Sequence, residues 1–298
     1  MHWITERQWK EFEEEGTDVH RLATGERGWL DRYGEHVLWS LGGRDRLPPT
    51  PPPEMITQLA ERFGFVAQGW LVRKLARDAS EQSPASILGG QDPGGFSVRE
   101  GAVHYRVEPS GGYSSGIFMD QRLNRKWVKG LAAPHMLNLF AYTCSFSVCV
   151  ALAGGRTLSV DASKRSLARG KENFSCNGLS IEEGHRFLAD DVMKVVPRLT
   201  KRGERFDLIV LDPPTFGRAA GRVFQVRRDL PGLVRDTFAL LSPGGWLLVS
   251  SNLGEWSFSS LRRICHDALE GGDFFLSTGE CPPEISGGAI SCRIRRTT

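Results

Sequence analysis

The stretch Phe206-Asp-Leu-Ile-Val-Leu-Asp-Pro-Pro-Thr-Phe216 decides the fold that this sequence predicts. Its apolar run, Leu208 to Leu211, is typical of a strand in a parallel sheet, because such strands are buried on both faces. The two prolines stiffen the backbone, so they hold an acid and an aromatic ring where the strand ends. The stretch is either a plain turn or the mouth of a binding cleft. We favour the cleft and expect its catalytic residues to be Asp212, Pro213, Pro214 and Phe216.

Four further segments predict strands of the same kind: 136–141, 157–161, 186–189 and 246–251. Helical stretches separate them, and strands that alternate with helices form a doubly wound parallel sheet. In such a sheet the ligand lies at the carboxyl ends of the strands. We therefore predict an α/β, Rossmann-like domain over residues 131–298.

Acidic residues follow two of these strands. Asp161 ends the second strand, where a carboxylate can accept hydrogen bonds from both hydroxyls of a ribose; an acid that only caps the next helix is the alternative. Ser163 is a good cap for the helix that begins there. After the third strand we expect Asp190 to cap the following helix. Asp191, with the apolar Val192 beside it, is expected to contact an adenine.

The glycine-rich pattern G-x-G-x-x-G, which binds the pyrophosphate of a dinucleotide, is absent from the sequence. This absence disfavours an NAD-dependent oxidoreductase and favours a nucleoside without phosphates, of which S-adenosylmethionine is the common one. The six cysteines form no C-x-x-C pair, and neither a Ser-His-Asp order nor H-E-x-x-H occurs. We therefore predict no metal site and no hydrolase activity.

The proline-rich segment 47–53 is expected to be a boundary, because its five prolines cannot lie within a helix or inside a sheet. Residues 1–53 hold 7 Lys/Arg and 10 Asp/Glu and predict a small acidic α+β appendage. Residues 54–130 are predicted to contain helical spacing over 54–78, interrupted near Gly64 and Gly69, and a β-hairpin about Glu100-Gly101, and to lead into the cofactor site. The sequence has no apolar run long enough to span a membrane and begins with polar residues, so we expect a cytoplasmic protein.

Several motifs occur in a fixed order along the predicted strands: Asn138-Leu-Phe-Ala-Tyr-Thr-Cys-Ser-Phe-Ser147, Ser159-Val-Asp161, Asp191-Val192 and the stretch from Phe206 to Phe216. Upstream of them lies Gly116-Ile-Phe-Met-Asp-Gln-Arg-Leu-Asn-Arg125. Together they resemble class I S-adenosylmethionine-dependent methyltransferases, and more narrowly the bacterial 23S ribosomal RNA large-subunit methyltransferases that modify cytosine C5 or guanine N7. The upstream segment resembles that family's G-x-F-x-D-Q-R-x-N-R motif. The resemblance covers roughly residues 104–256 and implies a seven-stranded sheet, S-adenosylmethionine as cofactor and 23S ribosomal RNA as partner.

The resemblance also implies which residues hold the cofactor. They would contact the methionine end, the ribose or the adenine of the cofactor, or line the first loop. These residues are Asp120, Gln121, Arg122, Asn138, Phe140, Tyr142, Thr143, Ser145, Asp161, Ser163, Asp191, Val192 and Asp212. One position departs from the family, because Cys144 stands where relatives have glycine. A Cβ there is expected to narrow the methionine pocket.

The cysteine positions bear on which atom would be methylated. Methylation of a pyrimidine at C5 needs a thiolate that adds at C6, and relatives with this activity carry the thiol after the fifth strand. Here that strand ends Val249-Ser-Ser-Asn252, without cysteine. Guanine N7 has a lone pair and needs only alignment with the methyl group. The sequence therefore favours guanine N7 over cytosine C5.

Two basic runs are candidates for RNA phosphates. The first lies beside the predicted pocket and gives the expected RNA-binding residues, Arg218, Arg222, Arg227 and Arg228. The second consists of Arg122, Arg125, Lys126 and Lys129. The alternative for each run is a solvated helix face. Two other functions stay open: a methyltransferase that acts on a protein or small molecule, and a non-catalytic RNA-binding module of the same fold.

Overall fold

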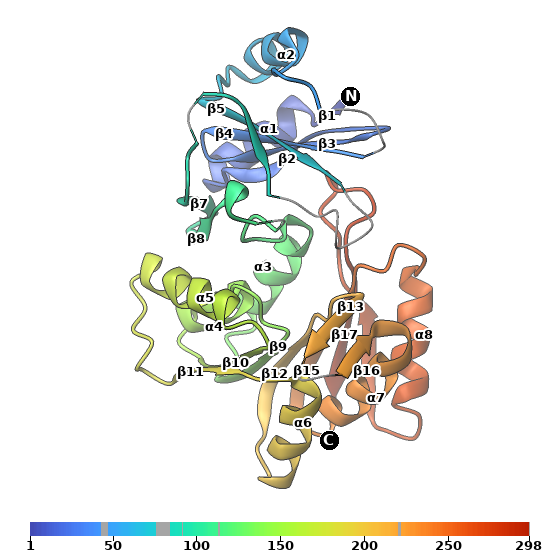
Figure 1. The fold of residues 1–298 in the computed structure, drawn as a ribbon. Coiled ribbons are helices and arrows are strands. Elements are labelled where there is room, and N and C mark those ends of the chain that lie inside the picture. Colours follow the sequence, from blue (N-terminus) through green and yellow to red (C-terminus); the bar gives the residue numbers. More distant parts are fainter. Residues whose placement is uncertain (43–46, 76–83, 91, 113, 220–221, 298) are drawn as a thin grey trace. The chain divides into compact units, whose positions relative to one another are not determined.

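The computed structural model describes residues 1–298 apart from 43–46, 76–83, 91, 113, 220–221 and 298, and apart from the side chains of 218, 219 and 222. The chain divides into two compact units (Figure 1). The first comprises Met1–Met119 and Pro283–Ile285, and the second comprises Asp120–Pro282 and Ser286–Thr298.

The first unit is an α+β structure on a six-stranded sheet whose strands follow the order of the chain. They are β1 (His2–Trp3), β2 (Val19–Gly25), β3 (Gly28–Tyr33), β4 (His36–Leu41), β5 (Gly69–Lys74) and β6 (Ser86–Gly89). The pair β4 and β5 is parallel, and the other neighbours are antiparallel. Helices α1 (Glu6–Glu15) and α2 (Pro53–Phe63) cover one face, where Leu22, Leu30 and Leu59 share an apolar cluster.

The helical segment expected over 54–78 is found only in its first part. Helix α2 ends at Phe63, because Gly64 adopts a left-handed conformation with φ 62° and closes the helix. Leu71, which the spacing placed on a helix, lies in β5 and pairs with Leu38 of β4. The helical prediction for this part is wrong because pairing with β4 outweighs the local spacing. The proline-rich segment lies between β4 and α2, so the sheet has strands from both sides of it. The domain boundaries after 53 and 130 stay predictions.

The hairpin about Glu100-Gly101 is confirmed. Strands β7 (Phe96–Glu100) and β8 (Val103–Val107) pair antiparallel, with Val98 opposite Tyr105. Gly101 supplies the positive φ, 59°, that the tight turn requires.

The second unit contains the predicted seven-stranded sheet, which confirms the doubly wound fold. Its order is β11 (His185–Ala189), β10 (Arg156–Asp161), β9 (His135–Leu139), β12 (Phe206–Leu211), β15 (Leu241–Ser251), β17 (Ile290–Arg296) and β16 (Phe274–Thr278). The first five strands are parallel, whereas β17 runs antiparallel to both of its neighbours. The predicted strands match the observed ones closely, except that β15 begins at Leu241 rather than at 246.

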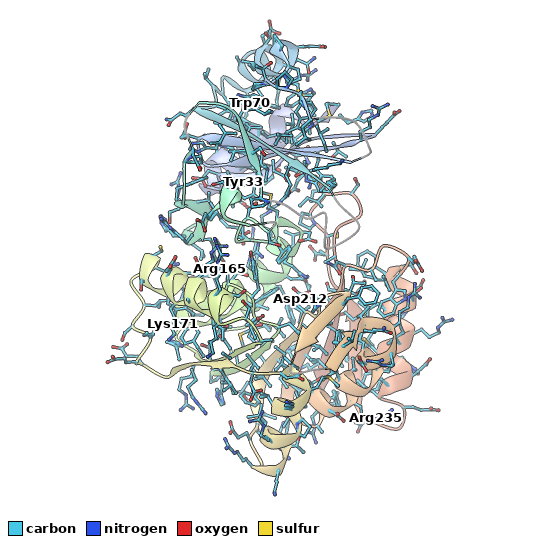
Figure 2. The ribbon with its side chains drawn as sticks, viewed as in Figure 1. Tyr33, Trp70, Arg165, Lys171, Asp212 and Arg235 are labelled. Atoms are coloured by element: carbon cyan, nitrogen blue, oxygen red, sulfur yellow. The ribbon has the colours of Figure 1, made fainter. Side chains whose placement is uncertain are left out.

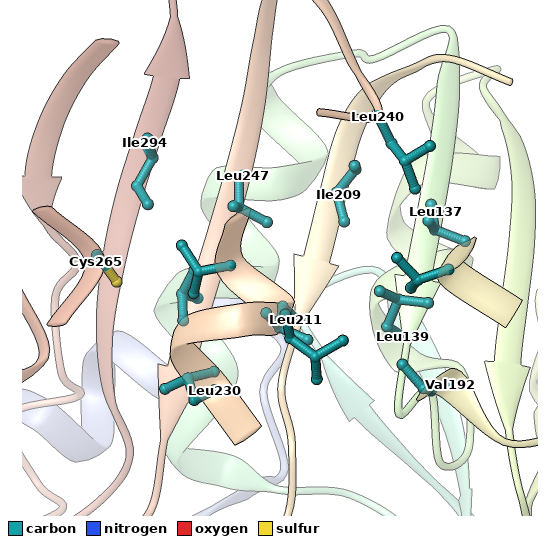
Figure 3. Close-up of a cluster of buried hydrophobic side chains, with 14 of the residues drawn as sticks. Leu137, Leu139, Val192, Ile209, Leu211, Leu230, Leu240, Leu247, Cys265 and Ile294 are labelled. Carbon is teal, nitrogen blue, oxygen red and sulfur yellow. The ribbon is translucent and has the colours of Figure 1, made fainter. Parts of the chain in front are cut away.

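Helices cover both faces of this sheet. On one face α6 (Val192–Lys201), α7 (Val226–Phe238) and α8 (Phe258–Ala268) pack on the strands through a large apolar cluster, which includes Leu211, Leu230 and Cys265 (Figure 3). On the other face lie α3 (Arg122–Gly130) and α4 (Ser145–Leu152), and α5 (Lys164–Cys176) packs against α4. A hairpin of β13 (Phe216–Ala219) and β14 (Arg222–Gln225) follows β12. Among the described residues, no helix is both long and apolar enough to cross a membrane.

Candidate cofactor and substrate site

The register of the sheet brings the expected site residues to one edge. Leu139 of β9 pairs with Val160 of β10 and with Leu211 of β12. Asp161 ends β10 and Asp212 directly follows β12, so both lie at the same edge as the loop after β9 (Asp212 is labelled in Figure 2). Because β9 lies between β10 and β12, this edge is the switch point at which doubly wound sheets bind ligands.

The loop after β9 is held in an unusual backbone conformation. Phe140, Tyr142 and Cys144 have φ values of 57°, 48° and 59°, a region that costs a non-glycine residue on the order of 1–2 kcal/mol. One hydrogen bond that holds the loop runs from the backbone N–H of Tyr142 to Oδ2 of Asp161, at 2.8 Å. Strained backbone of this kind clusters at ligand sites. Cys144, which stands where relatives have glycine, is the one position of this loop at which the sequence indicates such a conformation.

Asp161 accepts hydrogen bonds from the loop after β9 and from the start of α5. Its Oδ1 accepts from the backbone N–H of Ser163 at 2.8 Å, and Ser163 caps α5 as expected by accepting from the N–H of Ser166. Burial raises the pKa of Asp161, and the two backbone hydrogen bonds act in the opposite direction. Each carboxylate oxygen accepts more than one hydrogen bond, so this group can also accept from ligand hydroxyls.

Cys144 lies inside the helical layer. Its side chain is fully buried, and Sγ lies 3.8 Å from the carbonyl oxygen of Tyr142. A Cβ placed on Gly170 of α5 would lie 2.5 Å from this sulfur, so the missing side chain of Gly170 makes room for the thiol. Burial raises the pKa of the Cys144 thiol to about 12, which keeps it protonated. The volume of this side chain is therefore taken up between α4 and α5.

Of the two acids after β11, Asp191 rather than Asp190 caps the following helix. Asp191 caps α6, because its Oδ1 accepts from the N–H of Met193 at 2.9 Å. Asp190 instead pairs with Arg198 at 2.5 Å, and this hydrogen bond lowers the pKa of Asp190. The expectation that Asp190 is the cap is wrong, because the helix begins at Val192, directly after Asp191. The side chain of Val192 is buried in the apolar cluster under the sheet.

Three other expected cofactor residues lie in or near the first loop. Asn138 is buried in β9, and its Nδ2 donates to Oγ of Ser147 at 2.9 Å. Thr143 is also buried, and its carbonyl accepts from Nδ2 of Asn173 at 2.8 Å. Ser145 is the first residue of α4 and is partly exposed. The side chain of Asn138 and the carbonyl of Thr143 thus have structural partners, which fix the path of the loop.

Asp212 is held firmly at the end of β12. Its Oδ1 accepts from Oγ of Ser250 at 2.5 Å and from Nε2 of Gln121 at 3.1 Å. Burial raises the pKa of Asp212 to about 6, and the nearby carboxylate of Asp120 acts in the same direction, whereas Arg125 opposes it. Both of these donors bond to Oδ1, and no described residue donates a hydrogen bond to Oδ2.

The upstream motif is anchored to the end of the chain. The short helix η3 (Met119–Gln121) carries Asp120, whose Oδ2 accepts from the backbone N–H of Ala289 at 2.9 Å. Arg122 begins α3 and is half-buried, whereas Arg125 is buried almost completely. Arg125 therefore cannot belong to a surface basic run, which corrects that part of the second RNA candidate.

An exposed aromatic ring stands beside Asp212. Phe216 has 68% of its surface exposed, which is unusual for a ring that follows a buried strand. Thr215, just before it, donates from Oγ1 to Oδ1 of Asn252 at 2.9 Å, and this bond links the loop to the residue after β15. The sequence offered no signal for this pairing of two loops.

The expected RNA-binding arginines are only partly described. Arg227 forms an ion pair with Glu255, and Arg228 pairs with Asp229 at 2.9 Å. The side chains of Arg218 and Arg222 lie outside the described part of the structure. Glu255 lies in the loop after β15, far along the chain from the basic run that contains Arg227.

Comparison with known proteins gives the family. The model of S-adenosylmethionine-dependent methyltransferases matches residues 58–285. The chain belongs to this family. YwbD of Bacillus subtilis, which has the provisional name of a ribosomal RNA large subunit methyltransferase, is 39% identical over 176 residues, or 58% of this chain and 44% of YwbD. Ribosomal RNA large subunit methyltransferase I of Citrobacter koseri is 29% identical over 276 residues, or 88% of this chain and 68% of that protein. The chain thus spans less than half of YwbD.

The solved structures agree with the family. SMU.776, described as a candidate methyltransferase and crystallised with SAH, matches 97% of this chain and 78% of its own, with a TM-score of 0.83 and 25% sequence identity. S-adenosylmethionine is therefore the cofactor of this methyltransferase. The residues present fit this cofactor, because carboxylates stand at the carboxyl ends of β10 and β11, the next two strands on one side of β9 and its strained loop, and no phosphate cradle is required.

Proposed function

We propose that this methyltransferase modifies a base in RNA, that the RNA is 23S ribosomal RNA, and that the acceptor atom is guanine N7. The names of YwbD and of the Citrobacter protein support an RNA of the large ribosomal subunit. The observation that carries the choice of atom is the hydrogen bond from Ser250 to Asp212 at 2.5 Å. A hydroxyl in this place cannot add to a pyrimidine ring as a thiolate does.

The described cysteines support the same choice. Cys144, Cys149, Cys265 and Cys292 are buried, and burial raises the pKa of Cys144 to about 12. Of the other two, Cys176 is exposed at the end of α5, and Cys281 is half-buried with its thiol bonded to the carbonyl oxygen of Ala289. A nucleophilic cysteine needs a lowered pKa and access to the substrate. Covalent catalysis at cytosine C5 is therefore disfavoured, whereas N7 attacks with its own lone pair.

In this proposal each site residue has a separate role. Asp161 holds the ribose and Asp191 contacts the adenine of the cofactor, which supplies a methyl group on a positively charged sulfur. Phe216 stacks on the target base, and Oδ2 of Asp212 accepts from its N–H groups. Asp212 must be ionised to accept in this way, and no proton leaves N7. Alignment of the base is then the main task of the chain.

Short transcripts that contain 7-deazaguanosine test the acceptor atom. This base keeps the hydrogen-bonding groups of guanine and replaces N7 by carbon. We expect methyl transfer to the guanosine transcript and none to the 7-deaza transcript, with similar binding of both. Equal transfer to both would show that another atom is methylated. A protein or metabolite labelled in place of RNA would overturn the RNA substrate itself.

A further inference from the structure

A buried line of hydrogen bonds runs from β17 to Asp212. Ser291 donates from Oγ to Oδ1 of Asn124 at 3.2 Å, and Asn124 donates from Nδ2 to Oε1 of Gln121 at 2.7 Å. Gln121 then donates from Nε2 to Oδ1 of Asp212 at 3.1 Å. The line therefore joins β17, α3 and the loop after β12 through side chains alone.

The burial of these side chains determines which end of each amide donates and which accepts. Gln121, Asn124 and Ser291 are each at most 2% exposed, so water cannot replace a lost partner. The amide nitrogen of Asn124 can only donate, which fixes the oxygen end of Gln121 toward it. The nitrogen end of Gln121 must then face Asp212. The ionised carboxylate of Asp212 can only accept, which sets this direction, and the amide oxygen of Asn124 is then left to accept from the hydroxyl of Ser291.

Gly279 closes the line at its far end. Its N–H donates to the carbonyl of Ser291 at 2.8 Å, just after β16. A Cβ on Gly279 would lie 2.0 Å from Oγ of Ser291 and 3.0 Å from Oδ1 of Asn124. The glycine is therefore needed for the hydroxyl to reach Asn124.

We propose that Asn124 and Ser291 are positioning residues for methyl transfer, which hold the carboxylate of Asp212 through Gln121. The proposal rests on the proposed function, because it takes Asp212 as the group that contacts the base. Ser250 donates to the same oxygen from the other side. With both donors in place, Oδ1 is fixed and Oδ2 is directed to the substrate.

The charged groups around Asp212 set the expected pH effect. Asp120 of η3 raises the pKa of Asp212, Arg125 of α3 lowers it, and the donors Ser250 and Gln121 also lower it. Release of Gln121 removes one of these donors while the two charged groups stay. The titration midpoint of the Asp212 carboxyl should then rise by about 0.5 to 1 pH unit, which corresponds to the free energy of one lost hydrogen bond.

The first experiment combines variants along the line. Asn124→Ala and Gln121→Ala should each lower kcat about tenfold and move the acid limb of the rate to higher pH. If Asn124 acts through Gln121, the double variant should match Gln121→Ala within about twofold. Ser291→Ala removes only a hydroxyl, so it should lower kcat and move the acid limb in the same directions, but by less. Additive losses in the double variant would overturn the proposal.

Gly279→Ala is an independent probe of the same line. The new Cβ should displace the hydroxyl of Ser291 and reproduce the effect of Ser291→Ala. Adding Ser291→Ala to Gly279→Ala removes the nearest atom in conflict, so the double variant should lose no more activity than Ser291→Ala alone. Thr237→Val is the matched control, because it deletes another buried hydroxyl, bonded within α7. This variant should be less stable than the wild type, and the titration midpoint of Asp212 should not move.

The deciding readout does not depend on activity. The titration of Asp212 is followed by NMR in the full chain with ¹³C-labelled aspartate, and Asp212→Asn assigns the signal. We expect the midpoint to rise in Asn124→Ala, in Ser291→Ala and in Gln121→Ala, and not in Thr237→Val. An unchanged midpoint in the first three would overturn the positioning role. A raised midpoint in a protein that never methylates RNA would instead reject the proposed function and keep the line of hydrogen bonds.

Discussion

Oδ2 of Asp161 accepts the backbone N–H of Tyr142 at 2.8 Å, so the acid at the end of β10 holds the strained loop after β9. This hydrogen bond helps three left-handed residues to persist in a loop that contains no glycine. In the function proposed above, the same carboxylate also accepts from the ribose of the cofactor.

Asp161→Ala should weaken the binding of S-adenosylmethionine by about 1–3 kcal/mol, because it removes both the acceptor for the ribose and the anchor of Tyr142. Calorimetry of cofactor binding measures the change. Glu172→Ala, an exposed position on α5, is the control and should bind the cofactor normally. Unchanged affinity in Asp161→Ala would remove this assignment.

Asp212→Ala should abolish turnover while cofactor binding survives, because the base loses its acceptor and Ser250 and Gln121 lose their partner. In the wild type the rate should rise with pH through about 6, where Asp212 ionises. Rate measurements from pH 5 to 8, with cofactor affinity measured in parallel, test both statements. Normal turnover in the variant, or a rate that does not change across this range, contradicts the role of Asp212.

Asp212→Asn should increase stability at neutral pH. The folded pKa of Asp212 lies above its unfolded value, so the folded state favours the protonated form, and stability is lost as pH rises from about 4 to about 6. An asparagine avoids the burial of a charge and should gain about 1–3 kcal/mol at pH 8, and nothing below pH 4. Thermal unfolding across pH gives the difference. A gain of the same size at pH 3 would contradict the electrostatic explanation.

Gly170→Ala should destabilise the protein, because its Cβ would lie 2.5 Å from Sγ and 3.0 Å from Cβ of Cys144. Cys144→Gly removes the conflict and relieves a left-handed residue, so the double variant should regain most of the lost stability. Unfolding temperatures of the single and double variants test this pairing. If Gly170→Ala is as stable as the wild type, the packing of Cys144 against α5 is wrong.

Glu255→Gln should strengthen RNA binding. Glu255 pairs with Arg227 at the surface, and its neutralisation leaves that guanidinium to a phosphate. We expect a gain of about twofold to fivefold at low salt, which fades as salt is added. Glu270→Gln at the end of α8 serves as a control of equal charge change. Equal affinities for Glu255→Gln and the wild type would exclude Arg227 from the RNA surface.

The sequence predicted the parts of the fold that short-range patterns encode. The buried run Leu208 to Leu211 and the acids Asp161 and Asp212 identify strands and their ends directly, because parallel strands are apolar throughout. Strand β5 was missed, since Leu71 joins the sheet through a partner far along the chain. Local spacing carries no information about that partner.

The sequence predicted site residues that a single position or a short motif identifies, but not the contacts between distant segments. The contact between Asn124 and Ser291 joins residues separated by 167 positions, and that between Thr215 and Asn252 joins loops of different strands. Each forms only when the sheet brings distant segments together. The left-handed loop after β9 is indicated only at Cys144, where relatives have glycine. Phe140 and Tyr142 carry no such indication, because left-handed residues are usually glycine or asparagine.

The most direct test of the central claim is the identity of the methylated nucleoside. The purified protein is incubated with methyl-labelled S-adenosylmethionine and unmodified large-subunit ribosomal RNA, and the RNA is digested and examined by mass spectrometry. The structure leads us to expect labelled 7-methylguanosine, and no label with Asp212→Ala. Labelled 5-methylcytidine, or no labelled nucleoside although the cofactor binds, would contradict the account.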